Sequence, residues 1–263
     1  MTNEQNSLKD KAIIVTGSTT GIGEATVRLL ASNGARVLVH GRDEARARTI
    51  TAKLKNAAMH IDNLADPEAP TRIVQAAIDA FGRIDGVINN AAWVPRRHLM
   101  DTTAQIFDDV FAINARAPML LIQAAHKHLK KSAGSVVNIG SINAWCGEPS
   151  LLAYSMSKGA LMTMSKNLAD ALGKDGIRVN HLNVGWVLTE MEYQKKLDDG
   201  LEEGWPDRLP KHLIPITGKM TTPEQVAQAA AYWISPQSYP YSGVVCDLEQ
   251  YPFVGRNPDK EDS

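Results

Sequence analysis

The sequence has little of what covalent cross-linking, metal binding or membrane insertion would need. It contains two cysteines, Cys146 and Cys246, among 263 residues. We expect both to be small buried side chains in a reducing compartment, so we predict a cytoplasmic protein without disulfides. The seven histidines show no ligand spacing on one helix face, and we predict no metal. The first ten residues lack an apolar signal core, and no apolar run approaches the roughly 20 residues of a membrane span.

An excess of charge of either sign is also missing. Lysine and arginine total 28 and aspartate and glutamate total 29, which leaves a net charge of −1. No overall field would attract nucleic acid or an anionic membrane, so we predict neither as a partner. The length and the ordinary apolar content favour a single domain over residues 1–263.

Short apolar segments alternate with helical patterns along the chain. The segments with strand character are 11–16, 36–40, 58–61, 84–89, 135–139, 178–182 and 243–248, and the clearest helical patterns are 67–81, 101–130 and 153–172. This alternation predicts an α/β fold, a doubly wound parallel sheet with helices on both faces. The stretch from about 190 to 220 is less regular and rich in charge. We interpret it as a substrate loop, with disorder as the alternative.

A glycine turn follows the first predicted strand. Gly17, Gly21 and Gly23 lie between the strand at 11–16 and a helical pattern that runs to Gly34. Strand, glycine turn and helix form the context of a dinucleotide site, where the backbone approaches the pyrophosphate and the helix N-terminus offers free N–H groups. The spacing is G-x-x-x-G-x-G rather than the commoner G-x-G-x-x-G. Glycines that serve only a tight turn are therefore the alternative.

Tyr154 and Lys158 lie four residues apart in A-Y-S-M-S-K-G. A helix places such positions on one face. A cation within ~4–6 Å lowers the pKa of a tyrosine from its usual ~10. A phenol with a pKa nearer neutrality can take a proton from an alcohol or give one to a carbonyl. An ordinary surface pair is the alternative for this motif taken alone.

Several motifs together resemble the short-chain dehydrogenase/reductase family over nearly the whole chain. They are T-G-S-T-T-G-I-G at 16–23, N-N-A-A at 89–92, Asn114, Ser141 and Y-S-M-S-K at 154–158. The resemblance implies a Rossmann-like oxidoreductase that uses NAD(P). Members of this family are mostly dimers or tetramers, which implies a homo-oligomer here, with a homotetramer among the expectations.

The resemblance also implies the catalytic roles. Tyr154 is expected to be the general acid in reduction and the general base in oxidation. Lys158 is expected to hold the nicotinamide ribose and to lower the Tyr154 pKa. Ser141 is expected to hydrogen bond the substrate oxygen, and Asn114 to anchor a water that relays protons to Lys158. The simpler readings are a helix kink for Asn114 and a loop hydroxyl for Ser141.

The cofactor contacts implied by the resemblance lie in the glycine turn, at four strand ends and on the helix of the catalytic pair. They are Gly17, Ser18, Thr19, Gly21, Ile22, Gly23, Arg42, Asp62, Asn63, Asn89, Ala91, Tyr154, Lys158, Gly185, Val187 and Thr189. Asp62 resembles the residue that meets the adenine amino group. Gly41 stands where NAD-preferring members carry an acidic residue, and Arg42 follows it. We therefore predict NADP(H) in preference to NAD(H).

The substrate is the least specified part of the prediction. Aromatic residues follow strand ends or lie in the 190–220 loop, and such faces suit a sugar, a polyol or a flat apolar ring. The candidates are Trp93, Asn143, Trp145, Trp186 and Tyr193. We predict a small hydroxyl or carbonyl substrate, so that a 3-oxoacyl-[acyl-carrier-protein] reductase and a sugar or polyol dehydrogenase both stay open. A catalytically silent dinucleotide-binding regulatory module is the non-enzymatic alternative.

Two departures from the family pattern affect this prediction. Val184-Gly185 stands where the family has Pro-Gly, and the family's closing Asp-Gly-Gly is replaced near Glu249. We expect the 249–263 tail to reach a neighbouring subunit or to cover a pocket.

Overall fold

The computed structural model describes residues 8–211, 214 and 216–250, which form one seven-stranded sheet of order β3-β2-β1-β4-β5-β6-β7. The strands are β1 (Ala12–Val15), β2 (Arg36–Gly41), β3 (Ala57–Ile61), β4 (Gly86–Asn89), β5 (Ser135–Ile139), β6 (Arg178–Val184) and β7 (Val245–Leu248). Each neighbouring pair is parallel. The predicted doubly wound parallel sheet is confirmed, since each predicted segment contains or overlaps one of these strands.

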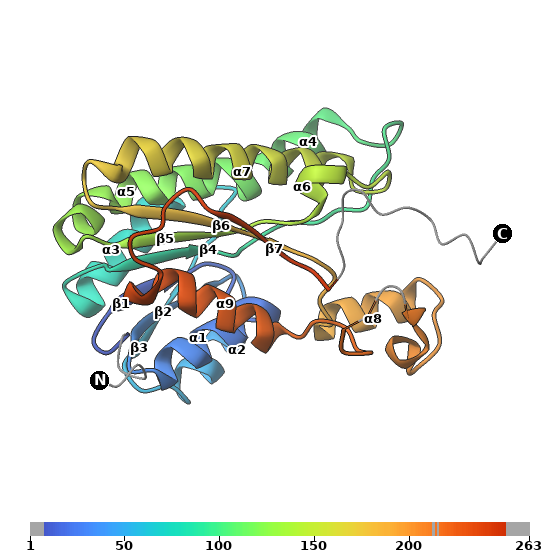
Figure 1. Cartoon of the computed structure of the whole chain (residues 1–263), viewed down its shortest axis with the longest axis horizontal. Coiled ribbons are helices and arrows are strands. Elements are labelled where there is room, and N and C mark those ends of the chain that lie inside the picture. Colours follow the sequence, from blue (N-terminus) through green and yellow to red (C-terminus); the bar gives the residue numbers. More distant parts are fainter. Residues whose placement is uncertain (1–7, 212–213, 215, 251–263) are drawn as a thin grey trace.

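Helices cover both faces of the sheet (Figure 1). On one face lie α1 (Gly21–Ser32), α2 (Glu44–Thr51) and α9 (Pro223–Ile234), and on the other α3 (Ala69–Phe81), α5 (Ala117–Ser132) and α7 (Leu152–Gly173). The pattern predicted as one helix over 101–130 is divided. It consists of α4 (Ala104–Phe111), a π-helical turn (Ala112–Arg116) and α5. Shorter elements are α6 (Asn143–Cys146), α8 (Glu190–Asp198) and the 3-10 turns Trp205–Arg208 and Pro236–Ser238.

The core is divided by the sheet into two apolar layers. Ile13 and Val15 of β1 point toward the layer beneath α1 and α9, whereas Ile14 points toward the layer beneath α3 and α5. Successive strand side chains alternate in this way, and here both faces are buried. This double burial explains why the strands read as continuous apolar runs rather than as alternating ones.

The described part of the 190–220 stretch is folded around an aromatic cluster. Trp205 is 3% exposed and stacks on Trp186, with ring centroids 5.5 Å apart, and on Tyr193 at 6.1 Å. Trp186 comes from the loop after β6, so these contacts tie α8 and its neighbours to the carboxyl edge of the sheet. The alternative prediction of disorder is therefore wrong for the described residues of this stretch, which form α8 and a 3-10 turn.

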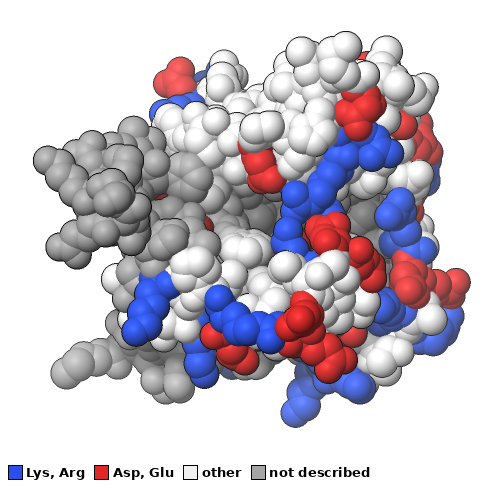
Figure 2. Space-filling view, turned by 90° about the vertical axis from the view of Figure 1, so that its right-hand side faces the viewer, with Lys and Arg blue, Asp and Glu red and all other residues white. Residues whose placement is uncertain are grey.

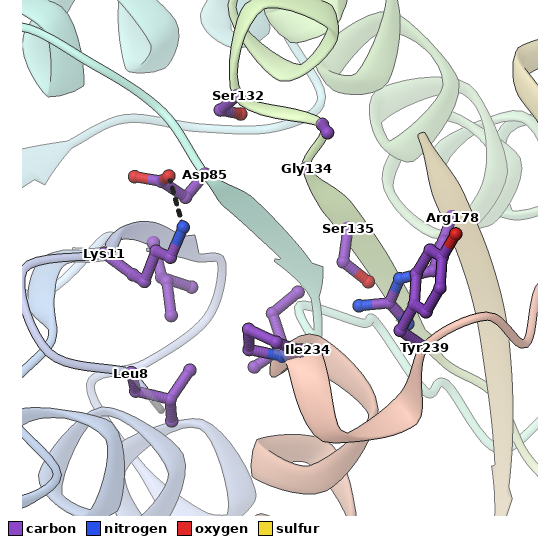
Figure 3. Close-up of a pocket in the computed structure, with 12 residues that line it drawn as sticks. Leu8, Lys11, Asp85, Ser132, Gly134, Ser135, Arg178, Ile234 and Tyr239 are labelled. Carbon is purple, nitrogen blue, oxygen red and sulfur yellow. Dashed lines mark hydrogen bonds and ion pairs between the residues drawn. The ribbon is translucent and has the colours of Figure 1, made fainter. Parts of the chain in front are cut away.

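A small hollow of about 140 Å³ lies at the amino edge of the sheet (Figure 3). Its Arg178 donates a hydrogen bond to the Ser235 carbonyl at 2.9 Å and another to the Ser238 hydroxyl. Arg178 thus complements the carbonyl end of α9, which carries partial negative charge. Lys11 pairs with Asp85 at 3.3 Å on the other side of the hollow. These contacts give the hollow a structural explanation, and the residues of the predicted site lie elsewhere.

Close packing in the glycine turn gives a first testable prediction. A Cβ at Gly23 would overlap the Gly17 carbonyl oxygen and the Asn90 amide, whereas a Cβ at Gly173, in the last turn of α7, would meet nothing within 4 Å. We expect Gly23→Ala to lower the free energy of unfolding by about 1–3 kcal/mol, as overpacking does. The matched variant Gly173→Ala should be neutral or stabilising, because alanine favours helix. Urea unfolding of both variants measures this, and equal midpoints would contradict it.

Candidate functional site

A cavity of about 530 Å³ opens at the carboxyl edge of the sheet, and three residues of the predicted catalytic set line it. Tyr154 and Lys158 come from the first two turns of α7, and Ser141 follows the end of β5. In a parallel sheet the carboxyl ends of the strands meet at one edge, which is where α/β folds bind ligands. The fold therefore brings together residues that lie 17 positions apart, from Ser141 to Lys158, in the sequence.

Lys158 is buried at the base of this cavity. Its side chain is 2% exposed, and Nζ donates a hydrogen bond to the Ile139 carbonyl at 2.7 Å. Nζ also lies 5.7 Å from the centroid of the Tyr154 ring. Burial disfavours the charged ammonium and lowers the pKa of Lys158 to about 8.

The pKa of Tyr154 differs from the expectation. Burial raises the pKa of this phenol, a hydrogen bond with Ser141 opposes the rise, and the negative charge of Glu148 adds to it. The sequence predicted a lowered pKa because of the neighbouring ammonium. That prediction is wrong for this structure, since the ammonium is hydrogen bonded to the Ile139 carbonyl and the loss of water around the phenol dominates.

Asn114 lies in the π-helical turn and joins two segments. Its Oδ1 accepts from the Trp93 N–H at 2.8 Å, and its Nδ2 donates to the Trp93 carbonyl and to the Ser157 hydroxyl, both at 3.0 Å. The irregular turn confirms the simpler reading of a polar residue at a break in the helix. The amide fixes the loop after β4 against α7, one position before Lys158. A water relay through Asn114 stays a prediction.

A chain of buried polar side chains runs across the carboxyl half of the sheet. Asn89 donates to Asn138 at 2.8 Å, Asn138 donates to Ser165 at 2.8 Å, and the Ser165 hydroxyl meets His181 Nδ1 at 3.0 Å. His181 Nε2 then meets Asn183 Oδ1 at 2.9 Å. Burial lowers the pKa of His181 to about 4, so its ring is neutral. Sequence reasoning used only Asn89, although two polar residues at period two within an apolar strand could have signalled the rest.

The glycine turn fits a dinucleotide phosphate. Thr20, which precedes α1, makes no side-chain cap to the helix, so the first N–H groups of α1 have no side-chain partner there. Gly17 packs so closely on Ala91 that a Cβ added at position 17 would lie 2.7 Å from the Ala91 Cα. Ser18 is buried and its hydroxyl accepts from the His40 N–H at 2.9 Å, which joins the turn to β2. An uncapped helix N-terminus beside close-packed glycines is a site for an anion.

The end of β2 leaves no room for an acidic side chain in the present packing. A Cβ at Gly41 would lie 2.5 Å from Thr19 Cγ2 and 2.6 Å from its hydroxyl. Arg42 is exposed, and it has no hydrogen bond or ion pair with the residues that the structure describes. Two neighbouring arginines of α2 are engaged, since Arg46 pairs with Asp43 and Arg48 pairs with Glu44. A free guanidinium therefore stands at this strand end.

Asp62 is already engaged by protein groups. Arg72 forms a fork on its two carboxylate oxygens, each at 2.8 Å, and His60 lies at 3.2 Å. The Asn63 N–H also donates to it at 2.8 Å. The hydrogen bonds from Arg72 hold the pKa of this carboxyl well below its usual range. Contact with adenine stays a prediction for Asp62.

The residues predicted to contact the nicotinamide lie in the loop after β6. Gly185, Val187 and Thr189 all line the cavity. Thr189 caps α8 by accepting from the Glu192 N–H at 3.0 Å. Glu249 accepts from the Trp186 N–H at 3.1 Å and occupies the space that a Cβ at Gly185 would need. Part of the predicted tail thus forms the cavity wall, and residues 251–263 lie outside the described residues.

The cavity contains only part of the predicted substrate set. Asn143 and Trp186 line it, whereas Trp93, Trp145 and Tyr193 are not among its lining residues. Trp145 is 49% exposed and donates to Asp247 at 3.0 Å. Sequence reasoning missed other charged residues of the wall, of which Glu148, Glu192 and Lys195 are examples. Lysine and arginine alternate with acidic residues on the face seen in Figure 2, which looks onto the carboxyl edge.

The described residues contain two free thiols. Cys146 is exposed and Cys246 half-buried, so the prediction of two buried side chains is wrong, and both thiols are free. In the described residues, no group of three or more His, Cys, Asp or Glu could hold a metal ion. Within the same part of the chain, no helix is both long enough and apolar enough to span a bilayer.

Comparison with known proteins decides the family. The family described as enoyl-(acyl carrier protein) reductase matches residues 17–247, most of the chain. A short-chain dehydrogenase/reductase named FrzI, from Cladobotryum, is 35% identical over 237 residues, which cover 88% of this chain and 91% of that protein. The chain belongs to the short-chain dehydrogenase/reductase family.

Other members of the short-chain dehydrogenase/reductase family carry more specific names. The L-fucose dehydrogenase of Mus musculus is 31% identical over 230 residues, with 87% of this chain and 84% of that protein covered. The solved structure of a 3-oxoacyl (acyl-carrier-protein) reductase from Agrobacterium tumefaciens C58, with NADP bound, covers 94% of this chain and 96% of its own. Its TM-score of 0.85 at 24% identity shows the shared Rossmann-like fold.

The buried ammonium gives a second testable prediction. An unfolded lysine has a pKa near ~10.4, whereas burial lowers the pKa of Lys158 to about 8. Between these values the unfolded state binds more protons, so Lys158 makes the folded state more stable as the pH rises from 8 to 10. In Lys158→Met this contribution disappears. Urea unfolding without cofactor at pH 7, 8, 9 and 10 should show wild type gaining about 1–3 kcal/mol relative to the variant. Parallel curves would contradict the burial of a charged amine.

Proposed function

We propose that this protein transfers a hydride between NADP(H) and a hydroxyl or carbonyl group of a small polyhydroxylated compound, such as a sugar or polyol. The observation that supports this most is the convergence of Ser141, Tyr154 and Lys158 in one cavity beside the uncapped glycine turn. The cavity is large enough for a small substrate next to a nicotinamide, at about 530 Å³. Family membership supports the same class of reaction.

The nicotinamide ring supplies the hydride in reduction and accepts it in oxidation. In reduction, the Tyr154 hydroxyl gives its proton to the oxygen of the substrate carbonyl, and Ser141 donates a hydrogen bond to the same oxygen. In oxidation, Tyr154 takes the proton of the substrate hydroxyl. In both directions, the hydrogen bond from Ser141 stabilises the negative charge that develops on the substrate oxygen. The raised Tyr154 pKa keeps the phenol protonated at neutral pH, which suits the donor role in reduction.

Lys158 and Asn114 act behind these two hydroxyls. We propose that Lys158 binds the nicotinamide ribose and that its charge stabilises the Tyr154 phenolate when it forms. Asn114 holds α7 through Ser157. We therefore propose that Asn114 positions this helix and does not contact the substrate. Because these groups are already in place before the reaction, they do not have to rearrange during it.

The preference for NADP(H) rests on the end of β2. The side chain of Thr19 occupies the space beside Gly41 where an acidic residue would hold a ribose 2′-hydroxyl. Arg42 is exposed, and its planar fork suits a 2′-phosphate. We therefore propose NADP(H) as the preferred cofactor.

The preference for a polyhydroxylated substrate rests on the walls of the cavity. Beyond the catalytic groups they include Arg96, Asn143, Glu148, Trp186 and Glu249. An extended acyl chain would need an apolar channel, because burying charged groups beside hydrocarbon is costly. Carboxylates, amides and an aromatic face can instead bind the hydroxyl groups and ring of a sugar. The similarity to an L-fucose dehydrogenase supports this choice over 3-oxoacyl reduction.

We also propose a homo-oligomer in a reducing compartment such as the cytoplasm. Met119 on α5 and Met156 on α7 are 44% and 48% exposed, which gives these two helices apolar side chains for packing against a second copy. Both cysteines are free, as they are in proteins kept reduced.

Removal of the phenolic hydroxyl tests the proposed chemistry. We expect Tyr154→Phe to bind NADPH as wild type does and to lose about 10²–10⁴-fold in kcat, because the proton donor is gone. Quenching of tryptophan fluorescence by NADPH measures binding, and NADPH oxidation with sugar-derived carbonyls measures turnover. The control is Tyr232→Phe on α9, whose side chain is partly exposed and is not among the residues that line the cavity. Near-normal turnover of Tyr154→Phe would disprove the mechanism.

Cofactor preference is tested at the end of β2. Arg42→Ala should raise the KM for NADPH about tenfold or more and leave the KM for NADH unchanged, because only NADPH presents the 2′-phosphate. Arg46→Ala is the matched control, since Arg46 lies one turn further along and pairs with Asp43 at 3.5 Å. If both cofactors weakened equally in Arg42→Ala, the proposed phosphate contact would be wrong.

A further inference from the structure

One wall of the cavity carries an ion pair, Arg96 and Glu148, that the Ser150 hydroxyl bridges on one side only. Arg96 Nη1 lies 3.4 Å from Glu148 Oε1 and 3.4 Å from the Ser150 hydroxyl. Arg96 Nε is buried and has no hydrogen-bond partner in the structure. The Ser150 hydroxyl in turn donates to Glu148 Oε1 at 2.9 Å, so it bridges one side of the pair. The other carboxylate oxygen of Glu148, Oε2, meets only the Asn143 amide among the described residues, at 3.5 Å. Because Nε is out of reach of a ligand, the open groups of the pair are Arg96 Nη2, which forms no hydrogen bond with the described residues, and Glu148 Oε2.

Two other arginines of this protein hold a carboxylate closely. Arg72 holds Asp62 through two bonds of 2.8 Å, and Arg83 holds Asp85 through bonds of 2.8 and 2.6 Å. Those are the fork geometries that a guanidinium prefers. The Arg96 pair uses one long contact and the Ser150 bridge instead, which leaves Nη2 of Arg96 and Oε2 of Glu148 for a third group.

The pair is held in place by its backbone. The Arg97 N–H donates to the Ser150 carbonyl at 2.7 Å, and the Leu152 N–H donates to the Arg97 carbonyl at 3.4 Å. These bonds join the loop after β4 to the segment that enters α7, two residues before Tyr154. The Asn143 N–H also meets the Ser141 hydroxyl at 3.2 Å. A rigid frame therefore keeps the open pair next to the hydroxyls that bind the reacting oxygen.

The charges of the cavity indicate a neutral ligand. Its lining contains four basic and three acidic side chains, which nearly cancel: Arg96, Lys158, Lys195, Lys196, Glu148, Glu192 and Glu249. A substrate carboxylate would gain from Arg96 but would be repelled by Glu148, which lies on the same nitrogen. A hydroxyl group can do both things at once, because its oxygen accepts from the guanidinium while its hydrogen is donated to the carboxylate.

We propose that Arg96 and Glu148 together bind a second hydroxyl of the substrate, next to the carbon that is oxidised, so that this site selects vicinal diols and the matching α-hydroxy carbonyls. This inference rests on the proposed function of the same cavity. In oxidation, one hydroxyl loses its proton to Tyr154 and its carbon loses a hydride to the oxidised nicotinamide. The neighbouring hydroxyl stays intact in the Arg96–Glu148 pair.

The test compares a six-membered mono-alcohol with its two vicinal diols, which carry one more hydroxyl. Oxidation of cyclohexanol and of cis- and trans-1,2-cyclohexanediol is measured with NADP⁺, and kcat/KM is expressed as the ratio of diol to mono-alcohol. We expect wild type to favour a diol by about 10²-fold, because a site built to hydrogen bond a hydroxyl rejects the analogue that lacks it. Glu148→Gln and Arg96→Gln should each reduce the ratio about tenfold or more. Oxidation of the diols and of the mono-alcohol depends on Tyr154 alike, so the ratio cancels any effect of the substitutions on the Tyr154 phenol.

The control and the binding measurement keep the two proposals separate. Arg97→Gln is the matched control, since the Arg97 side chain is exposed and donates only to the Arg96 carbonyl at 2.8 Å; it should keep the wild-type ratio. Diol binding to the NADP⁺ complex is also followed by the shift in Tm. One outcome would overturn the proposed reaction and support the inference: wild type turns over none of the alcohols, and diol binding is weakened only in Glu148→Gln and Arg96→Gln. A wild-type ratio in Glu148→Gln and Arg96→Gln, whether or not turnover falls equally on the diols and the mono-alcohol, would overturn the inference alone.

Discussion

The hydrogen bond from the Lys158 ammonium to the Ile139 carbonyl fixes how α7 meets the end of β5. A buried charge is costly, and the lowered pKa of Lys158 expresses that cost. The helix cannot slide or rotate without breaking this bond and leaving the charge unpartnered. Tyr154 lies one turn earlier on the same helix, and Ser141 follows the strand that supplies the carbonyl. The relative position of the two hydroxyls therefore depends on this contact.

Around this contact the protein replaces an apolar core with polar side chains that satisfy one another. Asn138, Ser165 and His181 link β5, α7 and β6 through bonds of 2.8 and 3.0 Å. Asn114 repeats the principle on the other side of α7 through Ser157. Fully satisfied polar networks specify a unique arrangement, whereas apolar side chains tolerate small shifts. The carboxyl half of the sheet is thus suited to hold groups that must be placed accurately.

Much of the fold was predictable because its signals are local. The apolar strands, the glycine turn before α1 and the spacing of Tyr154 and Lys158 each lie within a few residues of one another. The split of the 101–130 pattern was not predicted, since a π-helical turn depends on what Asn114 contacts 21 residues away, at Trp93. The raised pKa of Tyr154 was missed for a similar reason. Sequence spacing reports the neighbouring charge but not the loss of water that opposes it.

The sequence by itself determined the family and the parallel sheet, and it singled out the residues that we propose to act on a carbonyl or hydroxyl group. These follow from motifs and periodicities that are written along the chain. Only the tertiary structure decided which side chains form the cavity wall. Arg96 and Glu148 lie 52 positions apart and belong to no recognised motif. Their contact, and its open geometry, arise because parallel strands bring distant loops to the same edge, and no local pattern records which loops will meet there.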